Sequence, residues 1–311
     1  MRRLQTIGFL ESFQRWRILR RILQTRPIHT QPVSEKPGAC EVHILTWDGD
    51  WRMALWAAKS FYHFAGIDWP LVWHEGGSLR HAARAELGRH FPQSLVLTQD
   101  EADNLVEGEL KRGGFLRCLE ARRRSFMLLK MIDCLVLSRA ERLLQLDSDI
   151  LFFDRPEEIL SAVAARTPVN LFNRDGKNWY TVSPQAAKKR YGITLIEKIN
   201  AGLGLVRRES LPLAMLEEFL ADPDILADPW LTEQTLQALC ASKVGGKHLP
   251  DTYLVSMEPG LATADGRPLV AKHYPGFYRP YFYWEGLTNL IRQGFLDPAG
   301  GIGERGPGLF R

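Results

Sequence analysis

The sequence predicts an α/β protein whose central sheet is doubly wound and mainly parallel. Short apolar runs alternate with longer segments of helical periodicity between about residues 42 and 150, as is typical of parallel sheets covered by helices. Polar or acidic residues follow the apolar runs. Because ligands of doubly wound sheets bind outside the carboxyl ends of the strands, we expect these residues at a ligand-binding edge.

The elements of the first half follow one another in the order that this fold requires. Four apolar runs, bounded by charged residues, glycine or proline, predict strands over residues 42–47, 71–74, 94–97 and 143–146. Three segments between them predict helices over residues 51–65, 79–90 and 119–138. The acids that fall at predicted strand ends, and that we expect to converge on one edge, are Asp48, Glu75, Asp147 and Asp149.

The second half of the chain is less regular. An apolar run predicts a strand over residues 169–173, and the segment 200–206 begins with a polar residue and becomes apolar. Residues 230–240 are expected to enter a helix, and residues 271–284 are dense in aromatic residues and prolines. The sequence contains no internal repeat and no low-complexity tract.

The bulk composition is that of an ordinary globular protein of 311 residues, with 45% hydrophobic and 24% charged residues. The net charge is +4, but residues 1–26 alone contain seven arginines and one glutamate, so the rest of the chain is close to neutral. A general nucleic-acid-binding protein would carry its basic charge across a folded face, and this distribution argues against that class.

The charges and prolines divide the chain into three parts. Residues 1–40 form a basic N-terminal segment with a proline-rich linker, residues 41–290 form the main domain, and residues 291–311 form a C-terminal tail. If residues 1–26 are helical, their mixture of arginines and large apolar residues gives an imperfect amphipathic helix. Such a helix contacts an anionic membrane surface, packs on the body or remains a solvated arm.

The sequence predicts a cytoplasmic protein. It has no apolar run long enough to span a bilayer and no apolar signal-peptide core at its N-terminus. Peripheral contact with the inner face of the membrane through residues 1–26 is the alternative. A reducing compartment is favoured because the cysteines are scattered and form no C-x-x-C pair: Cys40, Cys118, Cys134 and Cys240.

The segment Asp147-Ser148-Asp149 is the first candidate site, because it places two carboxylates one residue apart between apolar runs. Neighbouring carboxylates repel unless a cation neutralises them. Hard divalent ions such as Mg²⁺ and Mn²⁺ prefer oxygen ligands, including substrate phosphates. The pair therefore indicates a site for a metal and a diphosphate, although such a pair on its own is more often a solvated turn.

The segment 272–281 is the second candidate site. A neutral imidazole at His273 can complete a metal shell begun by carboxylates, and Gly276 lets the backbone approach a ligand closely. Arg279 can bind a diphosphate through two hydrogen bonds, and Pro280 stiffens the turn that presents it. The alternative is an aromatic loop that contains a histidine with satisfied hydrogen bonds.

Taken in order, these segments resemble the glycosyltransferases of family eight and their relatives, which are retaining nucleotide-sugar transferases of the GT-A fold. The resemblance covers about residues 42–284. The family's D-x-D motif matches Asp147 and Asp149, and its N-[AS]-G segment matches residues 200–202.

Three further matches complete the resemblance. The family's acid–glutamine pair at the start of a helix matches Glu233 and Gln234. Its late motif H-[FY]-x-G-x-x-K-P-[WY] matches residues 273–281, with Arg279 in place of the usual lysine. The basic residue that members carry on the helix before the D-x-D motif is matched by Lys130.

The resemblance implies a Rossmann-like GT-A fold with a metal and diphosphate site at the carboxyl edge of the sheet. Asp147, Asp149 and His273 would bind Mn²⁺ or Mg²⁺ against the diphosphate of the donor, and Asp147 would also face its ribose or sugar. The other implied donor-binding residues are Thr46, Asp48, Lys130, Gly276 and Arg279.

The resemblance also implies that Asn200, Glu233 and Gln234 act at the donor sugar. The position of Gln234 lies close to the anomeric carbon in the family, and Glu233 is the nearest carboxylate that could serve as a nucleophile instead. The implied reaction transfers a hexose from a nucleotide sugar, with UDP as the family's commonest nucleotide and with retention of configuration. The resemblance does not identify the acceptor, which would be a carbohydrate, a lipid-linked molecule or a protein.

Two other functions stay open from the sequence. A sugar-phosphate nucleotidyltransferase on a related fold would carry a glycine-rich, basic phosphate loop after the first strand, whereas residues 46–52 contain one glycine among acids. A non-catalytic, membrane-associated scaffold would use the arginine-rich N-terminus and would not need to retain a complete set of metal ligands.

Overall fold

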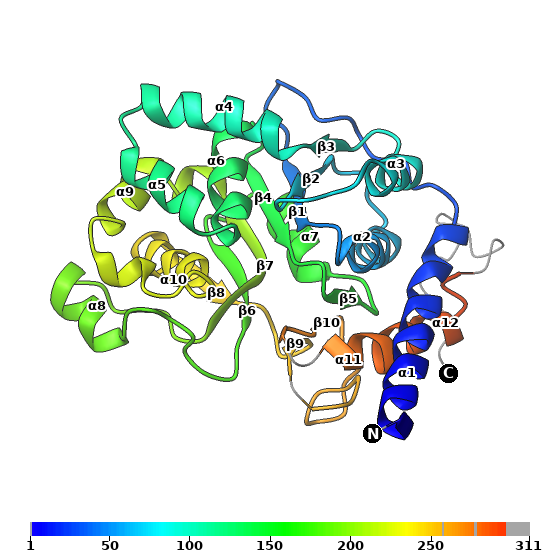
Figure 1. Cartoon of the computed structure of the whole chain (residues 1–311). Coiled ribbons are helices and arrows are strands. Elements are labelled where there is room, and N and C mark those ends of the chain that lie inside the picture. The colour runs from blue at the N-terminus through cyan, green and yellow to red at the C-terminus, as the bar shows by residue number, and fades with distance from the viewer. Residues whose placement is uncertain (1, 257, 277–278, 297–311) are drawn as a thin grey trace.

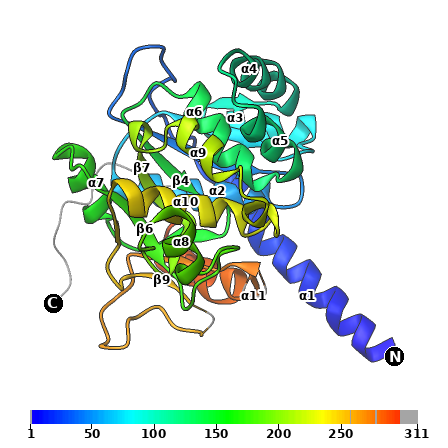
Figure 2. The same ribbon diagram turned by 90° about the vertical axis from the view of Figure 1, so that its left-hand side faces the viewer.

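The computed structural model describes residues 2–256, 258–276 and 279–296. Residues 297–311, which belong to the predicted C-terminal tail, lie outside the described residues. One ten-stranded sheet runs through the described part of the molecule, and helices cover both of its faces (Figure 1, Figure 2).

The sheet has a parallel half and a mixed half. In chain order its strands are β1 (Cys40–Thr46), β2 (Leu71–Glu75), β3 (Leu95–Leu97), β4 (Arg142–Leu146), β5 (Ile150–Phe152), β6 (Asn170–Arg174), β7 (Ile199–Arg207), β8 (Gly246–His248), β9 (Tyr253–Val255) and β10 (Ala271–His273). The spatial order is β3-β2-β1-β4-β7-β6-β9-β10-β5, with β8 paired to β6. β1 to β4 run parallel, whereas β7 is antiparallel to β4 and β6, and β5 is antiparallel to β10.

Two hydrophobic clusters hold the helices on the sheet. One includes buried residues of α2 (Trp51–Ala65), α3 (His81–His90), α7 (Glu157–Ala164) and α12 (Thr288–Arg292). The other includes α4 (Gln99–Arg112), α5 (Leu116–Arg124), α6 (Cys134–Leu137), α8 (Pro184–Tyr191), α9 (Leu213–Phe219) and α10 (Thr232–Val244). Leu144 and Leu146 of β4 enter the first cluster and Leu143 the second, because successive side chains of a strand point to opposite faces.

The predicted fold class is confirmed: the molecule is an α/β protein with a doubly wound, mostly parallel sheet. The four strands predicted in the first half correspond to β1 to β4 within two residues at each end. The helix predicted over residues 51–65 coincides with α2, which ends at Gly66 in the left-handed conformation with a φ of 62°.

The single helix predicted over residues 119–138 is wrong. α5 ends at Arg124, Ser125 is extended, and a π-helix (Leu129–Asp133) leads into α6. The buried Ser125 hydroxyl donates a hydrogen bond of 2.7 Å to the carbonyl of Pro229, and this contact with a distant loop holds the chain in its extended conformation between the helices.

The N-terminal segment forms α1 (Arg2–Arg20) and a 3₁₀ turn (Arg21–Gln24), and its end packs on the body. Ile22 is fully buried, and the indole Nε1 of Trp56 donates a hydrogen bond of 3.1 Å to the carbonyl of Leu19. The guanidinium of Arg15 lies over the ring of Tyr283, 5.7 Å from its centroid, and Figure 2 shows the N-terminal part of α1 pointing away from the body. Among the described residues, no helix has the length and apolar character needed to cross a membrane.

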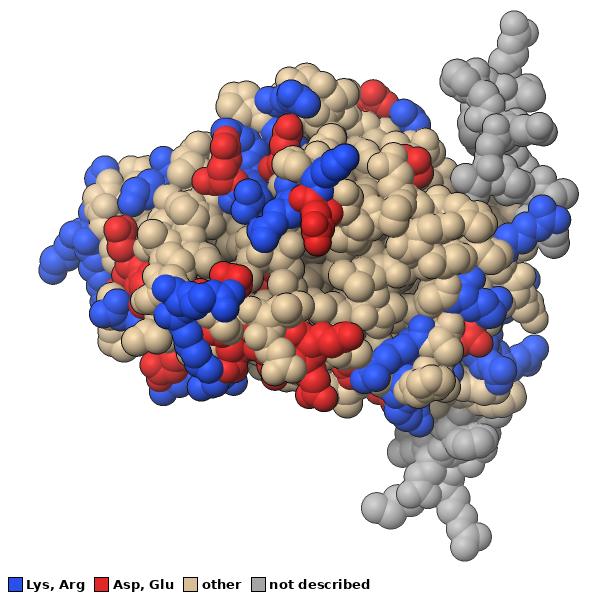
Figure 3. All heavy atoms as spheres, turned by 90° about the horizontal axis from the view of Figure 1, so that it is seen from above, with Lys and Arg blue, Asp and Glu red and all other residues tan. Residues whose placement is uncertain are grey.

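Charged side chains of both signs lie beside one another over much of the face seen in Figure 3. Neighbouring charges form ion pairs, such as Arg123 with Glu107 and Arg89 with Glu86. The charges on this face are thus of both signs, in agreement with the near-neutral composition of the chain after residue 26.

Candidate functional site

A pocket of about 620 Å³ lies where the loops after β1, β4 and β10 meet β7 and the start of α10. Its polar wall contains Asp50, Asp147, Ser148, Asp149, Asn200, Glu233, Gln234, His273 and Arg279. The pocket lies at the carboxyl ends of β1 and β4, which is the edge where doubly wound sheets bind ligands.

Hydrogen bonds from two sides fix the turn between β4 and β5. The Ser148 hydroxyl donates to Oδ2 of Asp50 at 2.7 Å, and the backbone N–H of Tyr274 donates to the carbonyl of Asp149 at 3.0 Å. The turn buries the side chain of Asp149 and leaves that of Asp147 23% exposed. Both carboxylates therefore line the pocket, Asp149 as a buried group and Asp147 as a partly exposed one.

The pairing of β10 with β5 brings His273 to this turn. His273 is opposite Ile150, the residue after Asp149, in an antiparallel register. Nε2 of His273 consequently lies 3.1 Å from Oδ1 of Asp149 and 3.9 Å from Oδ2 of Asp147. The three groups offer ligand atoms that all lie within 4.8 Å of one another.

A hydrogen bond on the far side of the imidazole orients His273. Its Nδ1 lies 2.9 Å from Oδ1 of Asn200, and Nδ2 of Asn200 donates to Asp175 at 3.0 Å. Because Asn200 presents an acceptor, the proton belongs on Nδ1, and Nε2 can direct its lone pair toward the carboxylates. Burial alone would lower the pKa of His273, but Asp149 and the neighbouring acids outweigh burial and raise it.

Lys130 is a fully buried cation in the wall of the site. Its Nζ lies 2.5 Å from Oδ1 of Asp147 and 3.2 Å from Oε1 of Glu233, and it donates a hydrogen bond to the carbonyl of Ala201 at 3.2 Å. Burial lowers the pKa of Lys130, but the two carboxylates outweigh burial and raise it above its usual range. Lys130 is therefore charged and holds Asp147 in place.

Arg279 is the second cation, and it lies at the exposed side of the site. Its Nε donates to Oδ2 of Asp149 at 3.0 Å, and 40% of its side chain is exposed. Burial raises the pKa of Asp149, but His273 and Arg279 outweigh burial and lower it below its ordinary value. Asp149 is thus an ionised carboxylate even though it is buried.

The donor set of Asp147, Asp149 and His273 fits a divalent cation. Two ionisable carboxylates supply the oxygen ligands that hard divalent ions prefer, and the imidazole supplies a nitrogen ligand for first-row transition ions. The hydrogen bond from Nδ1 of His273 to Asn200 is the outer contact that metal-binding histidines usually make.

Glu233 and Gln234 line the pocket from the first turn of α10. Burial raises the pKa of Glu233 to about 7, with Asp147 adding to the shift and Lys130 opposing it. Oε1 of Gln234 accepts a hydrogen bond of 3.2 Å from the backbone of Ala201, and its Nε2 donates to the carbonyl of Trp179 at 3.1 Å. The amide of Gln234 is therefore fixed at both ends.

Asp50 supplies the carboxylate of the first loop to the pocket, whereas Thr46 and Asp48 do not line it. The buried Thr46 hydroxyl donates to Oδ1 of Asp50 at 2.9 Å. Asp48 forms an ion pair of 2.5 Å with Arg80. Gly276 lines the pocket and has a φ of 54°, the left-handed conformation that glycine adopts without strain.

Two aromatic side chains at the pocket were not singled out from the sequence. Phe126 and Trp230 form a T-shaped pair with ring centroids 5.0 Å apart, and both line the pocket. Trp230 is 67% exposed. The available signal was a tryptophan three residues before Glu233, at the start of a helix that carries site residues.

No protein-family model matches the sequence, and no curated protein matches it either. Solved structures do match. The bifunctional glycosyltransferase WbbM in its apo form is 12% identical, covers 86% of this chain and 52% of its own, and has a TM-score of 0.51. Mouse xyloside xylosyltransferase 1 in its apo form is 15% identical, covers 73% of this chain and 87% of its own, and has a TM-score of 0.47. The galactosyltransferase LgtC with donor and acceptor sugar analogues is 12% identical, covers 81% of this chain and 95% of its own, and has a TM-score of 0.42.

The match with WbbM concerns the fold, and it confirms the GT-A type of fold expected from the order of the motifs. Membership of glycosyltransferase family eight stays a prediction, since no family model matches. The chain spans about half the length of WbbM.

Proposed function

We propose that the protein is a metal-dependent glycosyltransferase that moves a hexose from a nucleotide sugar to an acceptor. One observation carries the proposal: Asp147, Asp149 and His273 meet two cations, Lys130 and Arg279, at one pocket of a GT-A fold. Such a set of groups suits a divalent ion together with the phosphates of a nucleotide.

The diphosphate end of the donor would lie against the metal ligands and Arg279. Mn²⁺ or Mg²⁺ held by Asp147, Asp149 and His273 would act as a Lewis acid on the diphosphate. Arg279, whose side chain is 40% exposed, is positioned to bind the leaving nucleoside diphosphate, and the backbone of Gly276 lines the same wall. Because Lys130 is fully buried, it acts through Asp147 as a positioning residue.

The sugar end of the donor would lie near Asn200, Glu233 and Gln234. These residues line the pocket beside the acidic turn, and the amide of Gln234 is fixed by its two hydrogen bonds. We propose that the reaction retains configuration, with Gln234 or the neighbouring carboxyl of Glu233 facing the anomeric carbon.

We propose a UDP-sugar as the donor and a carbohydrate, a lipid-linked molecule or a protein as the acceptor. The exposed ring of Trp230, steadied by Phe126, offers an apolar surface on which a sugar ring can pack at the entrance of the pocket. Thr46 and Asp48 are proposed to support the nucleoside side of the pocket through the loop that contains Asp50.

Thermal stabilisation and donor hydrolysis with UDP-, GDP- and ADP-sugars, each with Mn²⁺, with Mg²⁺ and with a chelator, test this function. We expect one nucleotide class to raise the melting temperature and to be hydrolysed slowly only when the divalent ion is present. A folded protein that responds to no nucleotide sugar in the presence of metal would refute the proposal. Pyrophosphate release from a nucleoside triphosphate and a sugar phosphate would instead identify a nucleotidyltransferase.

We also propose that the protein lies in the cytoplasm and contacts the inner face of the membrane through α1. Phe13 and Trp16 are 47% and 43% exposed, and the guanidinium groups of Arg17 and Arg20 stack on their rings. Exposed aromatic rings together with arginines are the features of helices that lie on anionic lipid.

Sedimentation with vesicles that contain or lack anionic lipid tests the membrane contact. A double variant, Phe13→Ser with Trp16→Ser, is expected to weaken binding to anionic vesicles without exposing the docked residue Ile22. The control is Leu105→Ser, which alters a similarly exposed apolar residue on α4. Equal binding of the double variant and the control would contradict the proposal.

A further inference from the structure

A second group of potential metal ligands lies inside the molecule, on the face of the sheet that α6 covers. His43 belongs to β1, His74 to β2, and Cys134 is the first residue of α6. In the parallel register of β1 and β2, His43 is opposite Val72, two residues before His74. Both imidazoles therefore project from the same face, toward α6.

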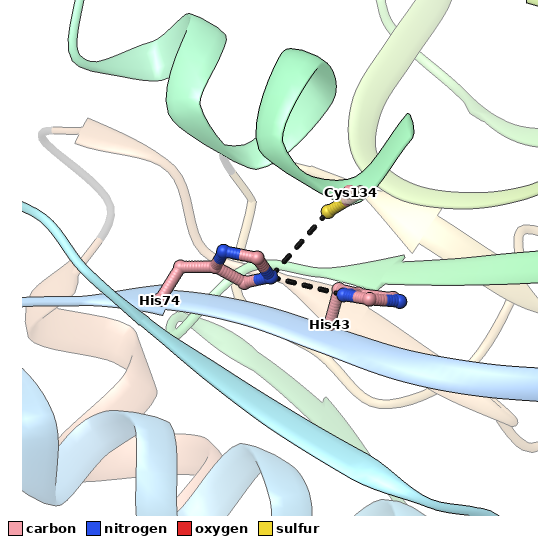
Figure 4. A group of neighbouring side chains, drawn as sticks. All are labelled: His43, His74 and Cys134. Carbon is pink, nitrogen blue, oxygen red and sulfur yellow. Dashed lines mark hydrogen bonds between the residues drawn. The ribbon is translucent and has the colours of Figure 1, made fainter. Parts of the chain in front are cut away.

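The three side chains converge on one point, as Figure 4 shows. Nδ1 of His43 lies 2.9 Å from Nε2 of His74, and Sγ of Cys134 lies 3.5 Å from the same Nε2. All three side chains are buried, and their ligand atoms lie within 4.8 Å of one another. Ligand atoms around a tetrahedral zinc ion are separated by roughly 3.4 Å or slightly more, so small shifts would suffice to admit an ion.

An acid on the far side of His43 sets the direction of its lone pair. Nε2 of His43 lies 3.3 Å from Oε2 of Glu41, and that carboxylate accepts a hydrogen bond from the hydroxyl of Ser138. A proton on Nε2 faces this carboxylate, which leaves Nδ1 with a free lone pair directed at His74 and Cys134. Carboxylate–histidine–metal arrangements of this kind orient metal-binding histidines in proteins.

The second histidine lacks such a partner. Nδ1 of His74 is buried and has no hydrogen-bond partner among the described residues; Nε2 of His43 also makes no hydrogen bond there, although it faces the carboxylate of Glu41. Its interactions with the other members of the cluster all run through Nε2, the nitrogen that faces His43 and Cys134. A cation bound at Nε2 would give this ring a stronger interaction than the neutral hydrogen bond it replaces.

We propose that His43, His74 and Cys134 bind one thiophilic transition-metal ion, Zn²⁺ or Cu⁺. Thiolate ligands select zinc, Cu⁺ and iron–sulfur clusters, imidazole suits zinc, copper, iron and nickel, and zinc and copper are the mononuclear ions common to both. The ion would join β1, β2 and α6 inside the core. Because Cys134 follows Lys130 by four residues, it would also hold the helical segment that carries Lys130 to the sheet.

This site is distinct from the site of Asp147, Asp149 and His273, and the proposal does not depend on the proposed glycosyl transfer. The ligands differ in kind as well as in position. A set with two carboxylates suits hard ions, whereas a set with a thiolate suits soft ones. A signal that arises only from a metal–thiolate bond therefore reports the second site alone.

Titration of the reduced, metal-free full-length protein with Co²⁺, a spectroscopic substitute for Zn²⁺, tests the site. We expect one equivalent of Co²⁺ to produce a thiolate-to-metal charge-transfer band. Zn²⁺ or Cu⁺ should then displace Co²⁺ and so remove the band. The ion that displaces Co²⁺ at the lower concentration is the one that the site prefers. Asp149→Ala is expected to retain the band, which separates this result from any failure of the donor site.

Two substitutions and one control assign the band to these residues. Cys134→Ser and His74→Gln should each abolish the band. In the Asp149→Ala background, in which Zn²⁺ is expected to raise the melting temperature through the second site alone, each should also abolish that rise. Cys240→Ala, which removes another buried thiol, should retain both. The absence of the band in the folded wild-type protein, its persistence in folded Cys134→Ser, or its loss in folded Cys240→Ala would overturn the proposal. If neither ligand variant folds, the proposal is tested by the band in the wild type and in Cys240→Ala: both must show it for the proposal to stand.

Discussion

The imidazole of His273 occupies the space that a side chain at position 202 would fill. A Cβ added to Gly202 would lie 2.4 Å from Cε1 and 2.7 Å from Nδ1 of His273, closer than real contacts allow. Nδ1 of His273 also donates a hydrogen bond to Asn200, two residues earlier on β7, and this bond orients the ring. The glycine of the N-A-G segment is thus required by the neighbouring histidine.

We predict that Gly202→Ala displaces His273 and lowers the metal-dependent response to the nucleotide sugar by about a hundredfold, because a shift of about 1 Å in a positioned group has effects of that size. Donor hydrolysis and thermal shift with Mn²⁺ measure the loss. Gly88→Ala in α3 is the matched control, since a Cβ there meets no atom within 4 Å. An unchanged response in Gly202→Ala would show that His273 does not act in the site.

A second prediction concerns Asp149, the carboxylate that contacts both His273 and Arg279. Asp149→Ala should abolish the dependence of donor binding on metal while the protein stays folded, because the carboxylate oxygens that it removes are proposed metal ligands. Thermal shift with donor and Mn²⁺ measures the effect. Asp154→Ala changes an exposed acid beyond β5 and should respond as the wild type does. Full metal-dependent turnover in Asp149→Ala would mean that the ion binds elsewhere.

The motifs in the sequence identified residues that the fold brings together, including Lys130, which holds Asp147, and Asn200, which orients His273, but they did not identify Asp50, which fixes the turn between the two acids. Asp147, Asp149 and His273 were chosen from spacing and residue type, and they meet at one pocket. The contact between Ser148 and Asp50 spans 98 positions of the chain. No spacing rule predicts such a contact, because it depends on how β1 and β4 lie in the sheet.

At the scale of elements, a buried ion pair spans the break between α5 and α6. Nε of Arg122 in α5 lies 2.6 Å from Oδ1 of Asp133 in the π-helix, and both side chains are 2% exposed. Arg122 also contacts Asp103 of α4 at 2.6 Å. The pair joins three helical segments around the turn that positions Lys130.

We predict that Arg122→Met destabilises the protein by about 3–5 kcal/mol, because it leaves the carboxylate of Asp133 buried without a partner. Urea denaturation measures the change in the free energy of unfolding. Arg124→Ala, which removes an exposed pair with Glu120, should cost less than about 1 kcal/mol. Adding Asp133→Leu to Arg122→Met should recover part of the loss, and no recovery would contradict the explanation.

The elements that the sequence predicted well are those whose signals are local. α2 has regular apolar spacing and a terminal glycine, and its predicted bounds agree with the structure. α4 was missed, although Thr98 and Glu101 form a capping box that begins it. The break at Ser125 could not be read locally, since residues 119–138 keep helical character and the decisive contact comes from Pro229.

At the scale of the whole molecule, a buried histidine links stability to pH. His90 is fully buried at the end of α3, and its carbonyl accepts a hydrogen bond of 2.9 Å from the backbone of Ile28 in the N-terminal linker. Burial lowers the pKa of His90 to about 3, and Lys59 and Arg89 add to the shift. The imidazole is therefore neutral in the folded protein at neutral pH.

We predict that His90 makes the folded protein lose stability as the pH falls from about 6.5 to about 3. In this window the unfolded chain, in which the pKa of histidine is near 6.5, binds a proton that the folded protein does not bind. The slope contributed by one such proton is about 1.4 kcal/mol per pH unit at most. Urea denaturation of wild type and His90→Gln across this range measures it, and parallel curves would refute the assignment.

The overall architecture was predictable only in its parallel half. β1 to β4 alternate with helices, and that alternation alone specifies parallel neighbours. β7 and β10 depart from this parallel arrangement. β7 lies between β4 and β6 and is antiparallel to both, whereas β10 lies between β9 and β5 and is antiparallel to β5. Strands of three residues such as β9 and β10 carry too little pattern to reveal their partners.

The place of β10 has a consequence for synthesis. Asp147 and Asp149 leave the ribosome long before His273, whose strand later pairs with β5. At roughly 5–20 residues per second, a nascent chain spends on the order of 10 seconds with the acidic turn made and its histidine not yet translated. Under the proposed function, the nascent domain would consequently bind a donor, and glycosyl transfer would begin, only after β10 has been made.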